Sequence, residues 1–367
     1  MHSSAISLSL AMVVLLPRLA TSAAESTNSP QPTFFFGQTN WSRFTRSTGA
    51  RAMQAFMTSP EIETPIAWDQ LVVSWNAETL PGSHLKFEAR AIYPSGPTRF
   101  YTLGLWSEDD TKTPRESVTG QRDDDGEVKT DTLVLNRPAH RAQVRITLTG
   151  LLEKSRPGLR FLGLSFLDSK ATAAPREPIR AAWGKVIDVP ERSQVPFGER
   201  QGWCSPTSTS MVLAHWAKVL NRPELDVPVP DVAKGVYDKN WPGTGNWPFN
   251  TAYAGKFRGL RGYVAQLKDI SDLEEWILSD VPVVLSVSYD LLKGKTEPRN
   301  SGHIIVCVGF TKDGDLVVND PWARLDEGQS VRKVFPRANL IPAWAASHNT
   351  AYLIYPESFA LKPSRTP

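Results

Sequence analysis

Apolar and polar residues alternate along much of the segment from residue 33 to 168, in short stretches separated by turn residues. Residues 85–91 and 144–149 show this alternation most clearly, and turn clusters such as residues 94–97 lie between them. A period of two places every second side chain on the same face of a β-strand. Because turns recur at short spacing and helix-length repeats are almost absent, this segment is predicted to be an all-β sandwich of the jelly-roll type.

The pattern changes after residues 169–180, an Ala- and Pro-rich stretch without periodicity that we interpret as a linker. In residues 181–360 helix and strand signals are mixed. Pro206 stands in the first turn of one predicted helix, where its missing N–H costs nothing, and residues 271–274 form a capping box that begins another. The apolar, β-branched residues 281–289 predict a buried strand. Helices combined with antiparallel strands predict an α+β domain.

Composition narrows the functional class. The chain has 367 residues, which is enough for about two domains. Its 41 Lys and Arg nearly balance its 38 Asp and Glu, so we expect no nucleic-acid partner. Two cysteines are too few for a four-cysteine zinc site, and the serine-hydrolase, zincin, P-loop and dinucleotide motifs are all missing from the sequence. We therefore expect neither a metal nor an organic cofactor.

The N-terminus has the layout of a secretory signal peptide. An apolar stretch at residues 5–16 is followed by small residues at 20–24, although no Lys or Arg precedes it. The stretch is shorter than the roughly 20 residues that span a bilayer, and nothing later in the sequence is long and apolar enough to do so. We expect residues 1–24 to be removed and the mature protein to be secreted or periplasmic, without a membrane anchor. The alternative is a cytosolic protein with an apolar N-terminus.

Cys204, in Gln-Gly-Trp-Cys-Ser-Pro-Thr, is the first candidate for chemistry. It lies directly before the predicted helix, where free N–H groups and the helix dipole favour the reactive thiolate. A thiolate needs a proton-transfer partner, and His303, at the start of an apolar strand, is the candidate. The alternative is a disulfide between Cys204 and Cys307. Against it, Cys307 lies within an apolar strand, where a free cysteine behaves as a small buried hydrophobe.

The strand that begins near His303 is predicted to belong to a β-hairpin whose turn is residues 311–314. With a loop of two or four residues, Asp320 shares a sheet face with His303. A three-residue loop would bring Asn319 to that face instead. We favour Asp320, because Asp-Gly at 313–314 suits a two-residue turn and residues 311–314 suit a four-residue one. Either side chain could accept the imidazole N–H and fix its tautomer.

Several motifs, in this order along the chain, resemble the bacteriocin-processing (double-glycine leader) peptidase-like family, the thirty-ninth cysteine peptidase family, of the papain-like clan. The resemblance covers about residues 186–355 and leaves the N-terminal segment uncovered. The motifs are residues 189–194, 203–208, 245–254, 282–287, 302–306 and 317–321.

The resemblance implies a role for each matching residue. Cys204 would be the nucleophile, His303 the general base and Asp320 the orienting acid. A glutamine upstream of the nucleophile usually completes the oxyanion hole in this family. Gln194 fits that place better, with Gln201 as the alternative.

We therefore interpret the protein as an exported cysteine peptidase acting on a peptide or protein substrate. Trp203 and Trp247 are candidate walls of a substrate groove, with the hydrophobic core as the alternative place for a tryptophan. One alternative function is a catalytically inactive papain-like domain in a surface protein, in which the N-terminal domain, with Trp41, Trp68, Trp75 and Trp106, contacts carbohydrate or cell wall. Another is a transglutaminase-type acyltransferase with the same triad.

Overall fold

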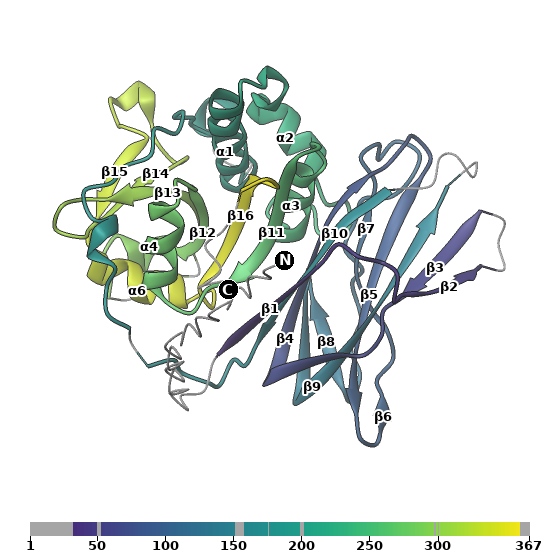
Figure 1. The fold of residues 1–367 in the computed structure, drawn as a ribbon. Coiled ribbons are helices and arrows are strands. Elements are labelled where there is room, and N and C mark those ends of the chain that lie inside the picture. Colours follow the sequence, from purple (N-terminus) through teal and green to yellow (C-terminus); the bar gives the residue numbers. More distant parts are fainter. Residues whose placement is uncertain are drawn as a thin grey trace, which may run out of the picture.

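The computed structural model describes residues 32–49, 53–150, 158–174, 176–198, 202–296, 299 and 301–359. The expected signal peptide, residues 1–24, lies outside them. The described residues form two domains that lie side by side, an N-terminal β domain and a C-terminal α+β domain (Figure 1). No helix in this described part of the chain is long and apolar enough to cross a membrane.

The β domain is a single sheet in which the longest strands, β4 and β9, pair with several neighbours. The central order is β1-β10-β4-β9-β3-β2, and β5, β7 and β8 attach to this path. The strands described are β1 (Thr33–Gln38), β2 (Thr45–Thr48), β3 (Gln54–Thr58), β4 (Ile62–Glu78), β5 (His84–Tyr93), β6 (Gly96–Pro97), β7 (Tyr101–Trp106), β8 (Gly126–Lys129), β9 (Thr132–Thr149) and β10 (Gly158–Leu167).

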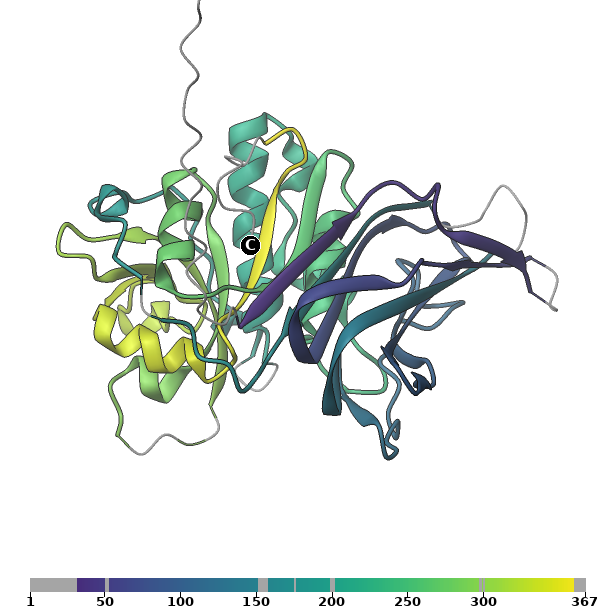
Figure 2. The same ribbon diagram turned by 60° about the horizontal axis from the view of Figure 1, so that its bottom comes forward.

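The strand-rich character of this domain agrees with the sequence prediction, but the two-sheet sandwich does not. One hydrogen-bonded sheet curls into a half-barrel (Figures 1 and 2). The register of β4 against β9 shifts twice, between Glu63 and Trp68 and again before Gln70. Such irregularities bend a strand and increase its twist, so that one long strand can pair with strands in both halves of a curved sheet. Alternation in the sequence cannot distinguish this arrangement from two stacked sheets.

Tryptophans fill the concave side of the curled sheet. Trp68, Trp75 and Trp106 are fully buried, and the Trp75 ring stacks on Phe87 with their centroids 4.0 Å apart. These three tryptophans therefore cannot serve as carbohydrate platforms, because a buried indole has no free face on which a sugar could stack. Trp41, the fourth tryptophan of that alternative, is only partly buried.

The C-terminal domain packs helices around a six-stranded antiparallel sheet of order β11-β16-β12-β13-β14-β15. Helix α1 lies against β13 and β16. The strands are β11 (Leu260–Gln266), β12 (Val283–Ser288), β13 (Gly302–Phe310), β14 (Leu316–Asn319), β15 (Arg332–Phe335) and β16 (Thr350–Pro356). The helices are α1 (Cys204–Leu220), α2 (Val229–Val236), α3 (Trp247–Gly255), α4 (Ile270–Leu278), α5 (Tyr289–Leu292) and α6 (Arg337–Ala345), with short 3-10 turns η2 (Arg180–Ala182), η3 (Val195–Phe197), η5 (Pro223–Leu225) and η6 (Leu325–Glu327).

The two domains share one apolar core at the place where β10 and β4 meet β11 and α3 (Figure 1). Phe249 of α3 is fully buried, and its ring lies 6.1 Å from Trp75 and 5.6 Å from Trp106, centroid to centroid. Polar bonds cross the same junction. Asn76 exchanges two hydrogen bonds with the backbone of Gly262, and the Val264 N–H donates to Ser74. The junction therefore resembles the interior of a domain.

We expect Phe249→Ala to destabilise both domains together, because its side chain fills a cavity that both line. Removal of a buried phenylalanine costs about 3–5 kcal/mol. Calorimetry should show one unfolding transition, moved to lower temperature. Val219→Ala, at an exposed position of α1, should leave the transition in place. Two separate transitions, with only one of them moved, would contradict the shared core.

Candidate active site

Cys204 is the first residue of α1, and it is partly buried. Gly202, with a φ of +61°, turns the chain into the helix, and no side chain caps the helix start. Its Sγ lies 4.0 Å from the Gly202 carbonyl oxygen, and the His303 imidazole and the backbone N–H groups of Ser205 and Ile304 are close enough to stabilise the thiolate. Burial alone would raise the pKa of the thiol, but His303 and these N–H groups lower it below its ordinary value. These interactions favour the thiolate form of Cys204.

His303 lies in β13 opposite Val287 of β12, and it is buried. Its Nε2 lies 2.8 Å from Oδ1 of Asp320, which leaves Nδ1 for the bond to Cys204. The Tyr289 ring packs against the imidazole with their centroids 4.5 Å apart. Burial alone would lower the pKa of His303, but the hydrogen bonds and charges of Asp320 and Cys204 raise it to about 9. The arrangement therefore favours a thiolate–imidazolium pair at neutral pH.

Asp320 is fully buried, and donors surround its carboxylate. Oδ1 accepts from His303 and from the Trp322 N–H at 2.9 Å. Oδ2 accepts from the Tyr289 hydroxyl at 2.6 Å and from Nζ of Lys333 at 2.7 Å. Burial alone would raise the pKa of this carboxyl, but its bonds to these partners, His303 first, hold it far below the usual range. Asp320 is thus an anion that fixes the direction of the imidazole.

A β-bulge brings Asp320 to the face of His303. The loop between β13 and β14 has five residues, 311–315, and an odd loop would by itself have placed Asn319 on that face. The register shifts between Cys307 and Gly309, which leaves Val308 as an extra residue and reverses the parity. The prediction that Asp320 shares a sheet face with His303 is therefore confirmed, but the predicted loop of two or four residues is wrong. Asn319 faces the other way and donates to the Val189 carbonyl.

The disulfide alternative is wrong, because Cys204 and Cys307 are both free. Cys307 is fully buried in β13, where burial raises the pKa of its thiol to about 12. It therefore has the inert role that its apolar neighbours suggested.

Gln194 is buried just before η3, with its backbone N–H bonded to the Pro321 carbonyl at 3.0 Å. This bond ties it to the residue after Asp320. Its side-chain Oε1 is buried without a hydrogen-bond partner. An unpartnered amide oxygen can accept an N–H of a ligand, whereas an oxyanion would be bound by the Nε2 donor of the same amide. The alternative residue, Gln201, lies outside the described residues.

The two candidate substrate-contacting tryptophans lie on different elements. Trp203 precedes α1, and its ring packs against Phe197 with centroids 5.8 Å apart. Trp247 is the first residue of α3, partly buried against the core. Each indole is therefore partly covered by neighbouring side chains and partly exposed.

Comparison with known proteins covers both domains. Residues 30–166 match the model of the Peptidase C39 N-terminal domain, and residues 186–352 match that of the Peptidase_C39 like family. The chain belongs to the peptidase C39-like family. A solved structure of a C39-like peptidase from Bacillus anthracis covers 47% of this C39-like protein and 98% of its own chain, with 18% identity and a TM-score of 0.36. No curated protein matches the chain.

Two further residues at the site, Tyr289 and Lys333, carry little or no sequence signal. Tyr289 was placed at the end of a predicted strand, and it does follow β12, but its hydroxyl bond to Asp320 could not be foreseen. Lys333 of β15 lies opposite Val318 and reaches the same carboxylate. No motif marks it, because the contact depends on the pairing of β14 with β15.

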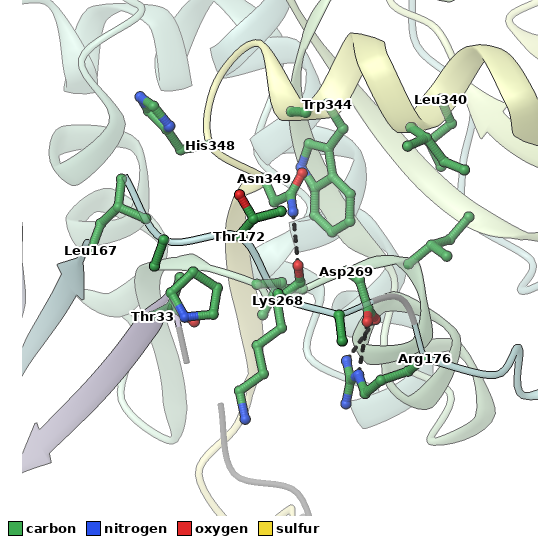
Figure 3. A pocket seen from close by; sticks show the side chains of 18 of the residues that line it. Thr33, Leu167, Thr172, Arg176, Lys268, Asp269, Leu340, Trp344, His348 and Asn349 are labelled. Carbon is green, nitrogen blue, oxygen red and sulfur yellow. Dashed lines mark hydrogen bonds and ion pairs between the residues drawn. The ribbon is translucent and has the colours of Figure 1, made fainter. Parts of the chain in front are cut away.

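A separate cavity of about 550 Å³ lies beneath the linker, between the linker, α6 and the loop before α4 (Figure 3). Trp344 and Leu340 line it, and Arg176 and Asp269 form an ion pair at its edge. It contains none of Cys204, His303 or Asp320. Among the described residues, no group of three or more His, Cys, Asp or Glu is placed to hold a metal ion. The chemistry of this C39-like protein is thus best sought at Cys204.

Alkylation by iodoacetamide should reveal the lowered pKa of the Cys204 thiol. We expect Cys204 to react at pH 7 and its rate to follow an apparent pKa below the ordinary thiol value. In His303→Ala that pKa should rise, because the main group that lowers it is gone, and the rate at pH 7 should fall about tenfold. Peptide mapping by mass spectrometry measures both cysteines, and Cys307 serves as the unreactive internal control. Equal labelling of Cys204 in both variants would contradict the pairing.

Proposed function

We propose that this protein is a cysteine peptidase that hydrolyses peptide bonds through Cys204, His303 and Asp320. The observation that carries the proposal is His303, whose imidazole is hydrogen-bonded to the buried carboxylate of Asp320 and, by its interaction with Cys204, lowers the pKa of the thiol. A nucleophile, a base and an orienting group in this order form the general arrangement of acyl-transfer enzymes. Membership of the C39-like family supports the same reaction class.

The proposed reaction begins with attack of the Cys204 thiolate on the substrate carbonyl carbon. The resulting oxyanion is stabilised by a backbone N–H at the start of α1 and by the Gln194 amide. As the C–N bond breaks, the His303 imidazolium gives its proton to the leaving amine, and a thioester remains. His303 then takes a proton from water, which attacks the thioester and releases the acid. The thiolate and the imidazolium are restored, so the protons balance.

The papain-like assignment of the C-terminal domain and the domain limits belong to the same proposal. We assign the β domain to residues 33–168, the linker to 169–180 and the peptidase domain to 181–360. The nucleophile stands at the start of α1, and the histidine lies on the antiparallel sheet against which α1 packs, at β13. This supports a papain-like arrangement, in which helix and sheet meet at the reacting atoms.

Turnover by Cys204→Ala tests the proposed reaction. We expect the variant to keep its circular dichroism spectrum and to lose hydrolysis of a casein or peptide-library substrate, because no other nucleophile replaces the sulfur. Cys307→Ala, which removes the other thiol, should remain active. Full activity in Cys204→Ala would refute the assignment. Amine adducts in preference to free acids, when an amine is added to the active protein, would indicate the transglutaminase-type alternative.

We also propose that the protein is exported and acts outside the cytoplasm. The proposal rests on the apolar stretch and small residues within residues 1–24. N-terminal sequencing of the protein secreted by a bacterial host should find a start near residue 25. A cytosolic product that retains Met1 would contradict export.

A further inference from the structure

The β domain holds one loop of the peptidase domain, residues 238–247, at both ends. At one end the fully buried Asp238 accepts a bond of 3.0 Å from the Ser117 N–H of the β domain. At the other, Asp131 of the turn between β8 and β9 accepts the Trp247 N–H at 2.9 Å. Arg115, also buried, donates to the carbonyl of Tyr237 just before the loop. The β domain thus fixes the path of the whole segment.

This loop reaches the residues around the candidate nucleophile. The Thr244 hydroxyl donates to the Gly202 carbonyl at 3.3 Å, two residues before Cys204. The Tyr352 hydroxyl lies 2.9 Å from the hydroxyl of Ser205, the residue after Cys204. The charges of Cys204 and of Asp131 both raise the pKa of Tyr352. Asp131 and Cys204 are thus both within electrostatic range of Tyr352, although Asp131 belongs to the other domain.

A cavity of about 360 Å³ lies between this loop and the turn between β8 and β9, within the size range of small-ligand sites. Both domains build it. Trp241, which is 44% exposed, and Trp247 contribute aromatic surface. Asp131, Lys129 and His348 are the titratable residues in its lining.

The cavity is lined by one carboxylate, Asp131, and by one lysine, Lys129. Lys129 is paired with Glu127 at 3.2 Å, and burial lowers the pKa of His348, so the imidazole is neutral at pH 7. Asp131 is only 7% exposed and accepts one bond on each oxygen, from Thr132 and from Trp247. Within the described part of the chain, no Lys or Arg forms an ion pair with it. A carboxylate so placed is desolvated without a countercharge, which is unfavourable until a cation arrives.

We propose that this cavity is a substrate pocket for a basic side chain, Lys or Arg, of a peptide, with Asp131 as its counter-ion and the faces of Trp241 and Trp247 as its walls. Indole faces attract cations, and a carboxylate beside them favours a positively charged side chain over a neutral one of the same shape. The proposal rests on the proposed function, and the loop that lines this cavity bonds through Thr244 to Gly202, two residues before Cys204. It gives the β domain a role in substrate recognition.

Binding to an inactive protein tests the pocket without requiring turnover. In the Cys204→Ala background, blocked alanine pentapeptides carry one arginine at each position in turn and are compared with the same peptides carrying citrulline, which has the shape without the charge. At pH 8, above the value of about 6 to which burial raises the pKa of Asp131, we expect arginine at one position to bind at least about tenfold tighter by titration calorimetry.

The change Asp131→Asn keeps an acceptor for the Trp247 N–H and removes the charge. We expect it to reduce the arginine-to-citrulline ratio to about two or less. Asp124→Asn removes the same charge from an exposed position of the same domain and should keep the ratio. No preference for arginine in the parent, or a preference that survives in Asp131→Asn, would overturn the pocket.

Turnover by the otherwise wild-type protein separates the two proposals. If the peptides bind with the Asp131-dependent preference but none is cleaved, the proposed function fails and the pocket stands. If they are cleaved without any preference, the pocket fails and the peptidase stands.

Discussion

The candidate site depends on a carboxylate that the fold has removed from water. Moving such a group into a protein interior costs several kcal/mol unless donors and countercharges replace its hydration. Asp320 accepts four hydrogen bonds. They come from His303 in β13, from Tyr289 in the helix after β12, from the backbone N–H two residues further along and from Lys333 in β15. Lys333 is the countercharge that remains when His303 is neutral. The imidazole can therefore gain and lose a proton while the anion that orients it stays in place.

The junction between the domains has the character of a core, and this bears on what the β domain is for. Phe249 fits between Trp75 and Trp106, and buried polar groups such as Asn76 bond across the boundary. A module that only tethers an enzyme to a surface needs no such contact. The two family models match the two domains separately, yet the chain folds them around one interior.

Much of the candidate site followed from sequence because it depends on local rules. Pro206 in a first turn and the apolar strand after His303 placed the nucleophile and the base on the correct elements, and the family motifs pointed to Asp320. Lys333 could not be found in this way, since it reaches Asp320 through the pairing of β14 with β15. The contact of Asp131 with Trp247 likewise depends on the docking of the two domains. The half-barrel was missed for a related reason. An alternating pattern in the sequence shows on which face of a strand each side chain lies. It does not show where a long strand such as β9 bends and changes its pairing partner.

The bulge at Val308 has an evolutionary consequence. Asn319 and Asp320 are neighbours that point to opposite faces of the sheet, and the parity of this hairpin decides which of them meets the imidazole. Loss or gain of one residue between the two strands would present an amide in place of an anion. The geometry of the contact would survive while its electrostatics changed. Length variation here is thus a route by which related chains could exchange an acid for an amide without any substitution at either position.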